Sequence, residues 1–319
     1  MMKLDRVSAF VAVADSGSIS AAAQRLGLSK SVVSERLAEL ERDLGASLIQ
    51  RTTRKMSLTE DGSAFLQRAR RIIRDLDEAV AELAERRGSL VGRLRLSAPV
   101  SFGSLHLGPA VYPFLRDNPG LQLTLELDDR FVDVTSEGYD GVIRHGAVRD
   151  ARLIAKRLAS SRRLLVAAPA YLATHGMPRT PAELENHSAI LYSNRDTDWR
   201  FAGAGRAIVV RPGKSMRVNN GIVMHDAALA GLGITLLPSF MIGPELADGT
   251  LQVIDLGLEA EGAEVHLVYP LERGTSAKLR ALVQCLRNAF GDPPYWEAGL
   301  RTGGAAPHSI ARTRLRSTG

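Results

Sequence analysis

The chain has 319 residues, of which 45% are hydrophobic and 24% charged, so it can form two or three ordinary soluble domains. Its single cysteine, Cys285, excludes an intramolecular disulfide and fits a reducing compartment, and the sequence has no apolar run of about 18 residues that would span a membrane. The N-terminus lacks the apolar core of a signal peptide, so we expect a cytoplasmic protein with no membrane association.

The formal net charge of +6 favours an anionic partner, but its distribution weakens that argument. Four arginines and no acidic residue lie in the C-terminal segment 298–319, which is also rich in Gly, Ser and Thr. This composition favours a disordered basic tail over a tail that contacts nucleic acid. Nucleic-acid binding must therefore be argued from where charge is placed in the folded part.

Three short helices are predicted within residues 1–60. The first carries one apolar stripe, made by Leu4, Val7, Val11 and Ala14. Ser18 is a good N-cap for a second helix, and Gly27 can take the left-handed conformation that ends it. Ser29 then caps a third helix. Two helices joined by such a short glycine turn indicate a helix-turn-helix, whose second helix lies in the major groove of DNA.

The third predicted helix has two distinct faces. Its apolar stripe consists of Val33, Leu37, Leu40 and Leu44, which we expect to face the core. Its N-terminus and opposite face carry mostly short or polar side chains that suit close approach to base edges and phosphates: Ser29, Lys30, Ser31, Val32, Ser34, Glu35 and Ala38. A plain three-helix bundle would show the same apolar stripe, so the helices alone leave both interpretations open.

Cations and hydroxyl groups are mixed after the predicted turn at Gly45. They are Arg51, Thr52, Thr53, Arg54 and Lys55, a set that suits contact with phosphate and the minor groove. The β-prone residues "MSLT" follow, so the segment is typical of a wing, a small hairpin beside the recognition helix. A basic wing in this place favours DNA binding over the plain bundle.

This N-terminal stretch resembles the DNA-binding domain of LysR-type transcriptional regulators. The matching elements are Phe10, "SGSISAAAQRLGLS", Ser34, Leu40-Glu41, Leu44-Gly45, Leu48, Arg51, Arg54, Leu58-Thr59 and Gly62. The resemblance implies base contacts from Lys30, Ser31, Ser34 and Glu35, and contacts of Arg51 and Arg54 with the DNA backbone.

Two positions depart from the pattern of that family. Ile49 stands where Phe is usual, and Glu35 stands where a basic residue is usual. A carboxylate does not bind phosphate, but it can accept a hydrogen bond from N4 of cytosine. We therefore expect Glu35 to read a cytosine, or to turn away while Arg36 contacts the DNA backbone.

A long linker helix is predicted over residues 61–88. Leu58, Phe65, Ala69, Ile72, Leu76, Ala79 and Leu83 follow the heptad spacing of a coiled-coil seam. The alternative is a helix packed on its own domain. We favour a seam between two copies, formed by the six residues from Phe65 onward, because a helix-turn-helix monomer rarely binds DNA tightly. A homodimer or homotetramer is therefore expected.

Residues 91–297 alternate strand-like and helical segments. The strand-like segments are "RLRLSA", "LQLTLELDD", "DGVIRHG", "RLLVAAP", "AILYS" and "GITLLP". Helical segments, notably "NNGIVMHDAALAG", separate them. This alternation predicts an α/β domain with parallel sheets, and its length favours two lobes over one large sheet. In such domains ligands bind outside the C-terminal ends of the strands.

The same region resembles the effector-binding domain of LysR-type regulators, which is shaped like a periplasmic solute-binding protein. Matching phrases are "FLRDNPGLQLTLEL", "FVDVTSEGYDGVIRHG", "AAPAYLATHGMPRTPAELENHSAI" and "AALAGLGITLLPSFM". The expected fold is thus α/β, with an N-terminal winged helix-turn-helix, a long linker helix and a two-lobed periplasmic-binding-protein-like effector domain. His145 departs from the usual aliphatic run and would mark a subgroup.

An effector pocket is predicted between the lobes. Pro99, Val100, Ser101 and Phe102 join a strand to a helix, so amides there suit a carboxylate. Arg144, at a strand end, suits an anion, although a surface ion pair would explain it equally well. The resemblance implies further pocket residues on the facing lobe, which are Ser193, Asn194, Val218, Asn219 and Asn220. An ordinary turn with an N-cap would also explain the Asn pair.

The sequence offers little to an enzyme. It has no His-x-x-x-His or Cys-x-x-Cys pair, so we expect no metal and no cofactor, and Cys285 on an apolar helix face fits a packed thiol better than a nucleophile. We therefore predict a transcription regulator whose partners are double-stranded promoter DNA, a small anionic effector and RNA polymerase. The alternative is a solute-binding protein or metabolic enzyme of the same α/β fold, with an N-terminal domain that only dimerises.

Overall fold

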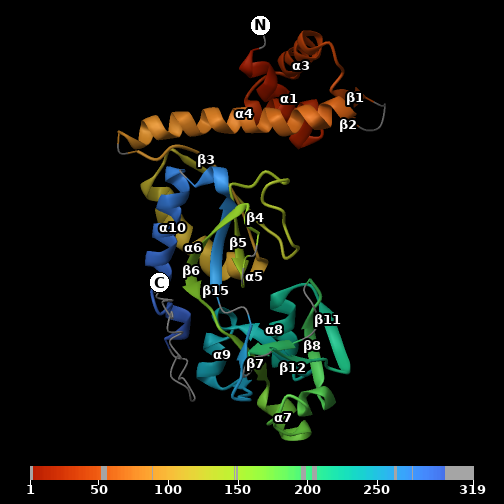
Figure 1. Cartoon of the computed structure of the whole chain (residues 1–319), viewed down its shortest axis with the longest axis vertical. Helices are drawn as coiled ribbons and strands as arrows, with labels where there is room; N and C mark the ends of the chain where they lie inside the picture. Colours follow the sequence, from red (N-terminus) through yellow and green to blue (C-terminus); the bar gives the residue numbers. More distant parts are fainter. Residues whose placement is uncertain are drawn as a thin grey trace, which may run out of the picture. The chain divides into compact units, whose positions relative to one another are not determined.

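The computed structural model describes residues 3–51, 56–87, 89–146, 148, 150–194, 199–202, 207–261, 264–274 and 276–298. The chain separates into two compact units (Figure 1). The first consists of residues 1–94 with the short segments 118–122 and 276–278, and the second of the remaining residues. Thr52, Thr53, Arg54 and Lys55 and nearly all of the predicted basic tail lie outside the described residues.

The first unit contains the predicted helices and hairpin. They are α1 (Leu4–Ser16), α2 (Ile19–Leu26), α3 (Lys30–Leu44), β1 (Ile49–Arg51), β2 (Met56–Leu58) and α4 (Glu60–Glu85). Ser18 caps α2 by accepting a hydrogen bond from the Ala21 amide at 3.1 Å. Gly27 ends α2 with φ of 65°, a left-handed conformation that glycine adopts without strain. The helix-turn-helix prediction is confirmed in its local geometry.

The core of the first unit is built from one face of each helix. Phe10, Val33, Leu37 and Leu40 are all fully buried, as their spacing predicts. Leu44 is different: it lies in the last turn of α3 and its side chain is 37% exposed. The prediction that Leu44 belongs to the core is wrong, because the helix ends at Gly45 and the chain turns away there.

Helix α4 changes surroundings along its length. It begins at Glu60, so Leu58 lies in strand β2 and not in the helix. Ala69 is fully buried in the core of the first unit, and Phe65 packs against that core. The predicted seam between copies is therefore wrong for Phe65 and Ala69, because their positions are filled from within the chain. Farther along the helix, Ile72, Leu76, Val80 and Leu83 are exposed, as is Ala79.

Gly62 explains how closely the start of α4 approaches the turn before the wing. A Cβ at this position would lie 2.0 Å from the carbonyl oxygen of Leu48, a distance that no real side chain shows. The preceding Thr59 caps the helix, since its hydroxyl accepts from the Gly62 amide at 2.9 Å and donates to the Ser47 carbonyl at 2.7 Å. The wing is thus fastened to α4 through the backbone.

The second unit contains two lobes, each with a five-stranded sheet. Lobe 1 has the strand order β4-β3-β5-β15-β6. Its elements are β3 (Gly92–Ala98), α5 (Val100–Phe102), η1 (Gly103–Leu107), α6 (Gly108–Asp117), β4 (Leu121–Leu127), β5 (Gly141–His145), β6 (Leu153–Ser160), β15 (Glu264–Pro270), η4 (Leu271–Arg273), α10 (Ala277–Phe290) and η5 (Tyr295–Glu297). Strand β15, drawn in blue in Figure 1, lies between strands from much earlier in the chain.

Lobe 2 has the strand order β11-β8-β12-β7-β13 and a small additional sheet, β10-β9-β14. Its elements are β7 (Arg163–Ala167), α7 (Pro169–His175), η2 (Glu183–Asn186), β8 (Ser188–Tyr192), β9 (Trp199–Ala202), β10 (Ala207–Val210), β11 (Lys214–Val218), α8 (Gly221–Leu229), β12 (Ile234–Pro238), η3 (Ser239–Met241), α9 (Gly243–Asp248), β13 (Gln252–Val253) and β14 (Glu259–Ala260).

The predicted parallel pairing is present in both five-stranded sheets, but neither sheet is parallel throughout. Strands β3 and β5 pair in parallel, as do β8 with β11 and β12. However, β15 is antiparallel to both β5 and β6, and β7 is antiparallel to β12. Parallel neighbours need a crossover connection, usually a helix, whereas β15 reaches lobe 1 directly from lobe 2. Within the described part of the chain, no helix has the length and apolar character to cross a bilayer.

Candidate DNA-binding surface and effector cavity

The start of α3 is a capped helix end with small polar side chains. The backbone of Ser29 is extended, and its hydroxyl accepts a hydrogen bond from the Val32 amide at 3.3 Å. The hydroxyl groups of Ser29 and Ser31 lie 2.8 Å apart. Lys30 and Ser31 are exposed, while Val32 is half-buried. Free amides at a helix start and short side chains together suit phosphate and base edges.

Glu35 and Arg36 occupy different environments on α3. Glu35 is exposed, and Ser34 beside it is half-buried. The Arg36 guanidinium lies 3.4 Å from the Asp5 carboxylate of α1, so it has an ionic partner within its own unit. Contact of Arg36 with the DNA backbone would have to compete with this ion pair. The roles predicted for Glu35 and Arg36 stay predictions.

Glu41 fixes the wing relative to α3. Its carboxylate accepts hydrogen bonds from the amides of Leu48 at 2.8 Å and Ile49 at 3.1 Å, which lead into β1. Arg51 pairs with Met56 at the far end of the hairpin, next to the undescribed segment 52–55. Sequence reasoning matched Glu41 to a pattern but missed this role. The sequence feature that could have indicated this role was an acidic residue in the last turns of α3 with no evident cationic partner.

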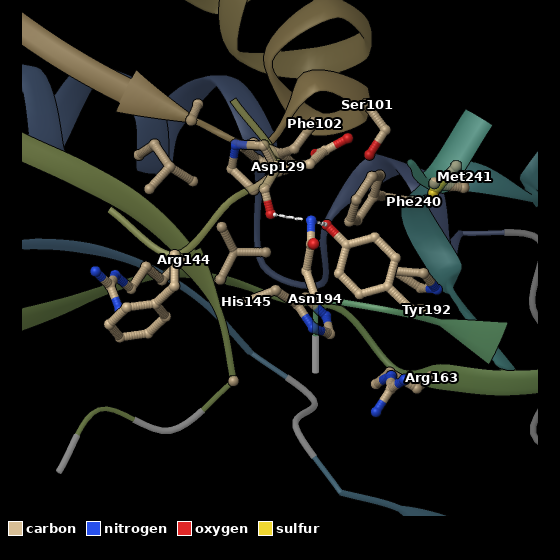
Figure 2. Close-up of a pocket in the computed structure, with 18 of the residues that line it drawn as sticks. Ser101, Phe102, Asp129, Arg144, His145, Arg163, Tyr192, Asn194, Phe240 and Met241 are labelled. Carbon is tan, nitrogen blue, oxygen red and sulfur yellow. Dashed lines mark hydrogen bonds between the residues drawn. The ribbon is translucent and has the colours of Figure 1, made fainter. Parts of the chain in front are cut away.

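A cavity of about 830 Å³ lies between the two lobes of the second unit (Figure 2). Among the predicted effector residues, Pro99, Ser101, Phe102, Arg144 and Asn194 line it. The predicted residues Val100, Ser193, Val218, Asn219 and Asn220 do not line it. The positions of Ser193, Val218 and Asn219 do not support the prediction that they bind an effector. Val100 and Asn220 are both hydrogen-bonded to Asp129 instead.

Asp129 joins the lobes with both its side chain and its backbone. Its carboxylate accepts from the Val100 amide at 2.9 Å in lobe 1 and from the Asn220 side-chain amide at 2.8 Å in lobe 2. Its carbonyl oxygen accepts from Asn194 at 2.7 Å and from the Tyr192 hydroxyl at 3.1 Å, both shown in Figure 2. An anionic ligand was predicted at the start of α5, and the Asp129 carboxylate of the chain itself occupies that position.

Asn220 has a second task in the same place. Its side-chain oxygen accepts hydrogen bonds from the amides of Ile222 at 3.0 Å and Val223 at 3.2 Å, so it caps α8. The cap explains the Asn-Asn pair as an ordinary helix start. It uses only the side-chain oxygen of Asn220, so the side-chain NH2 group can donate to Asp129. Sequence reasoning missed Asp129, although it follows the end of a strand in "LDDR".

Arg144 lines the cavity but is engaged elsewhere. Its guanidinium stacks over the Phe131 ring, 3.7 Å from the ring centroid, and donates a hydrogen bond to the Val132 carbonyl. In Figure 2 Arg144 lies at the side of the cavity away from Asn194. The stacking contact uses the face of the guanidinium and holds it beside Phe131.

Other charged or titratable side chains also line the cavity. They include Arg163, Arg200, His145 and Glu261. The Asp128 carboxylate, also in the lining, is held by Arg130, whose backbone amide and guanidinium lower the pKa of that carboxyl. The wall is therefore polar and mixed in charge, with more cationic than anionic side chains away from Asp129.

Ser97 adds an unsatisfied polar group to the cavity. It lies on β3, lines the cavity and is 1% exposed. Its hydroxyl has no hydrogen-bond partner among the residues that the structure describes. A buried hydroxyl without a partner costs about 1–3 kcal/mol, and a polar ligand would remove that cost. Ser97 was not among the predicted site residues, because an alternating strand does not distinguish a core serine from one that faces a cavity.

His106 marks a buried junction behind the cavity. One ring nitrogen lies 2.9 Å from the Phe240 carbonyl of lobe 2, and the other is hydrogen-bonded to the Tyr295 hydroxyl. Phe102 and Trp296 pack around the ring. Burial lowers the pKa of His106 below its ordinary value of 6.5, because desolvation disfavours the imidazolium.

Cys285 lies half-buried on α10. Its sulfur is 3.9 Å from the Ala110 carbonyl, and burial raises the pKa of the thiol, so the reactive thiolate is disfavoured. In the described ranges, no group of three or more His, Cys, Asp or Glu side chains is arranged to hold a metal ion.

Two family models together match most of the chain. Residues 4–63 match the model described as bacterial regulatory helix-turn-helix protein, lysR family, and residues 87–291 match the LysR substrate binding domain.

Relatives of similar length carry regulator names. The chain is 35% identical over 299 residues to the HTH-type transcriptional regulator PtxR of Pseudomonas aeruginosa, covering 92% of this chain and 95% of that protein. It is 34% identical over 284 residues to an uncharacterized HTH-type transcriptional regulator of Haemophilus influenzae, covering 88% and 99%.

Solved structures show the same likeness. CrgA, a LysR-type transcriptional regulator from Neisseria meningitidis, covers 90% of this chain and 99% of its own, with a TM-score of 0.55 at 27% identity. The full-length Vibrio cholerae virulence activator AphB covers the same shares with a TM-score of 0.56 at 26% identity.

Proposed function

Because the chain belongs to the LysR family of helix-turn-helix transcriptional regulators, we propose that it binds promoter DNA through the start of α3 and its wing and responds to a small anion between its lobes. Family membership argues against the alternative that the chain is a solute-binding protein or an enzyme. The protein would act in the cytoplasm, where promoter DNA is found.

The observation that carries the DNA-binding proposal is the exposed start of α3. Lys30 and Ser31 are exposed beside the cap at Ser29, and Glu41 holds the start of the wing to the same helix. The base-contacting set is proposed to be Lys30, Ser31, Ser34 and Glu35, with Arg51 and Arg54 on the backbone. Ser29, Val32, Arg36, Thr52, Thr53 and Lys55 complete the proposed surface.

Assembly is proposed to use the later part of α4. The exposed residues Ile72, Leu76, Ala79 and Leu83 keep the heptad spacing that a helix pair needs. A homodimer is the smallest assembly that presents two recognition helices to a near-palindromic operator. A homotetramer would pair two such dimers, and RNA polymerase is the further partner through which the bound protein would act.

The effector is proposed to be a small anion. The cavity of about 830 Å³ is of the size that takes small molecules, and Arg163, Arg200 and His145 line it. Occupation of the cavity would shift the relative populations of two arrangements of the lobes. A changed spacing of the paired DNA-binding units would then alter promoter binding.

Fluorescence anisotropy with the full-length protein tests DNA binding. The probe is a labelled duplex carrying the region upstream of the protein's own gene, with a shuffled duplex as the comparison. Lys30→Ala should weaken binding, whereas Lys156→Ala, which removes the same charge from an exposed site on β6, should not. Equal affinity for both duplexes, or equal loss in both variants, would contradict the proposal.

A further inference from the structure

The interlobe anion position is already occupied by the chain itself. The Asp129 carboxylate takes one donor from each lobe, the Val100 amide and the Asn220 side-chain amide. Asp129 lines the cavity, whereas neither of its two donors does. The carboxylate therefore covers the donors that would otherwise face the cavity.

We propose that Asp129 acts as a built-in competitor of the effector, and that a carboxylate-bearing effector binds by replacing the Asp129 side chain on Val100 and Asn220. This rests on the proposed function, because it describes how the same cavity is regulated. It adds a specific chemistry: the effector carries a carboxylate that bridges the two lobes at these donors.

The geometry allows the side chain to leave without separating the segment from lobe 2. The backbone carbonyl of Asp129 keeps its own hydrogen bonds to Asn194 and Tyr192, which do not involve the carboxylate. The donors are equally suited to an external carboxylate, because both are neutral N–H groups and one sits at a helix start.

A second observation points to a polar ligand in the same cavity. Ser97 is one of the residues that line the cavity, and its buried hydroxyl has no partner among the described residues. Asp129 already has its partners and does not satisfy it. An effector that also reached the Ser97 hydroxyl would supply the hydrogen bond that this group lacks.

Competition of this kind has a measurable sign. The observed affinity of a ligand that must displace an internal group is its intrinsic affinity multiplied by the fraction of protein in which that group has already left. Removing the Asp129 carboxylate should therefore tighten the binding of an external carboxylate by roughly tenfold or more. A residue that only stabilised the fold would give the opposite result on removal.

Hydrogen exchange of the full-length protein, read by mass spectrometry, tests this with succinate as the probe at constant ionic strength. Asp129→Ala should speed exchange at the Val100 amide, and succinate should restore its protection, whereas the unsubstituted protein already protects this amide through Asp129. Calorimetric titration should show that succinate binds Asp129→Ala about tenfold more tightly than the unsubstituted protein. The matched control is Asp117→Ala, which removes the same charge from an exposed position at the end of α6 that does not line the cavity. It should behave as the unsubstituted protein.

A second variant approaches the site from lobe 2. Asn220→Asp keeps an oxygen to cap α8 but loses the N–H group that holds Asp129. It should bind succinate more weakly than the unsubstituted protein does, because one of the two donors is gone. The two variants thus change the response to succinate in opposite directions.

The proposal is overturned if succinate binds Asp129→Ala and the unsubstituted protein equally tightly, or fails to protect Val100 in Asp129→Ala. It is also overturned if Asp117→Ala shows the same gain in affinity, since the effect would then be one of general charge. These readouts do not involve DNA. A chain that ignored its promoter but showed the expected exchange would sink the proposed function and leave the role of Asp129 standing.

Discussion

The rings of Phe10 in α1 and Phe65 in α4 lie 5.6 Å apart, within the core of the first unit. This contact ties the first turns of the linker helix to the helix-turn-helix. Any seam between two copies must therefore begin farther along α4, where the apolar side chains are exposed. The linker helix is thus partly a core helix and partly a free surface.

Charged substitutions in the exposed part of α4 should dissociate the dimer. Ile72→Asp and Leu76→Asp each place a charge in the proposed helix pair, where it would lose water without gaining a partner. Gln67→Asp adds the same charge at another exposed position of α4 and should leave assembly unchanged. Sedimentation velocity at several concentrations measures the result, and a dimer that survives both substitutions would refute the seam.

The wing arginines should set the salt dependence of DNA binding. If Arg51 and Arg54 each neutralise one phosphate per protomer, replacing either by Ala should reduce the slope of log affinity against log salt by about one unit per site. Anisotropy titrations over a range of salt concentrations give the slope. An unchanged slope in both variants would remove the wing from the proposed surface.

Glu35 should affect sequence preference rather than general affinity. If its carboxylate accepts from cytosine N4, Glu35→Ala should lose about 1–3 kcal/mol of discrimination at one base pair and none elsewhere. Binding to the operator and to each of its single-base variants measures this. Identical preferences in the variant and the unsubstituted protein would mean that Glu35 does not read a base.

Gly62→Ala should loosen the junction between the wing and α4. The new Cβ would lie 2.0 Å from the Leu48 carbonyl oxygen, so the backbone must shift, at a cost of about 1–3 kcal/mol. Ser63→Ala, at the next and exposed position, should change stability by no more than about 0.5 kcal/mol. Urea unfolding followed by circular dichroism compares them. Equal stabilities would show that the approach of the two segments is not tight.

The effector domain should lose stability as the pH falls below about 6.5, the ordinary pKa of histidine. Burial lowers the pKa of His106 in the folded state, so the unfolded chain binds a proton first and is favoured as the pH decreases towards the folded pKa. His187, whose pKa is also lowered by burial, adds to the same trend. Melting temperatures from neutral pH to about pH 5 should show this slope.

His106→Gln isolates the contribution of His106. Glutamine keeps a hydrogen-bond donor for the Phe240 carbonyl but does not titrate. Its stability should be lower at neutral pH but should fall less steeply with acid than that of the unsubstituted protein. A slope equal to that of the unsubstituted protein would assign the pH dependence to other groups.

Local signals explain why the first unit was predictable from sequence. Ser18, Gly27 and Ser29 determine where α2 and α3 begin and end, and each acts on amides or backbone angles within a few residues. Periodicity likewise placed Val33, Leu37 and Leu40 in the core. Spacing does not show what each apolar face packs against. Phe65 and Ala69 are therefore predicted to contact another copy, although they pack in the core of their own unit.

The cavity was less predictable because its chemistry depends on distant residues. Asp129 meets Val100 and Asn220, which are 29 and 91 positions away in the sequence. No local pattern marks such an encounter, and an exposed turn would contain the same "LDDR" residues. The antiparallel pairing of β15 has the same origin, since it depends on the route by which the chain returns to lobe 1.

That return has a consequence for biosynthesis. The helix-turn-helix and its wing are complete once about the first seventy residues have left the ribosome, because their packing is local. Lobe 1 lacks the strand between β5 and β6 until residue 270 has emerged, after all of lobe 2 has been made. A nascent chain can therefore carry a folded helix-turn-helix while its effector-binding lobes are still incomplete. A premature stop codon before β15 would release a protein in that state.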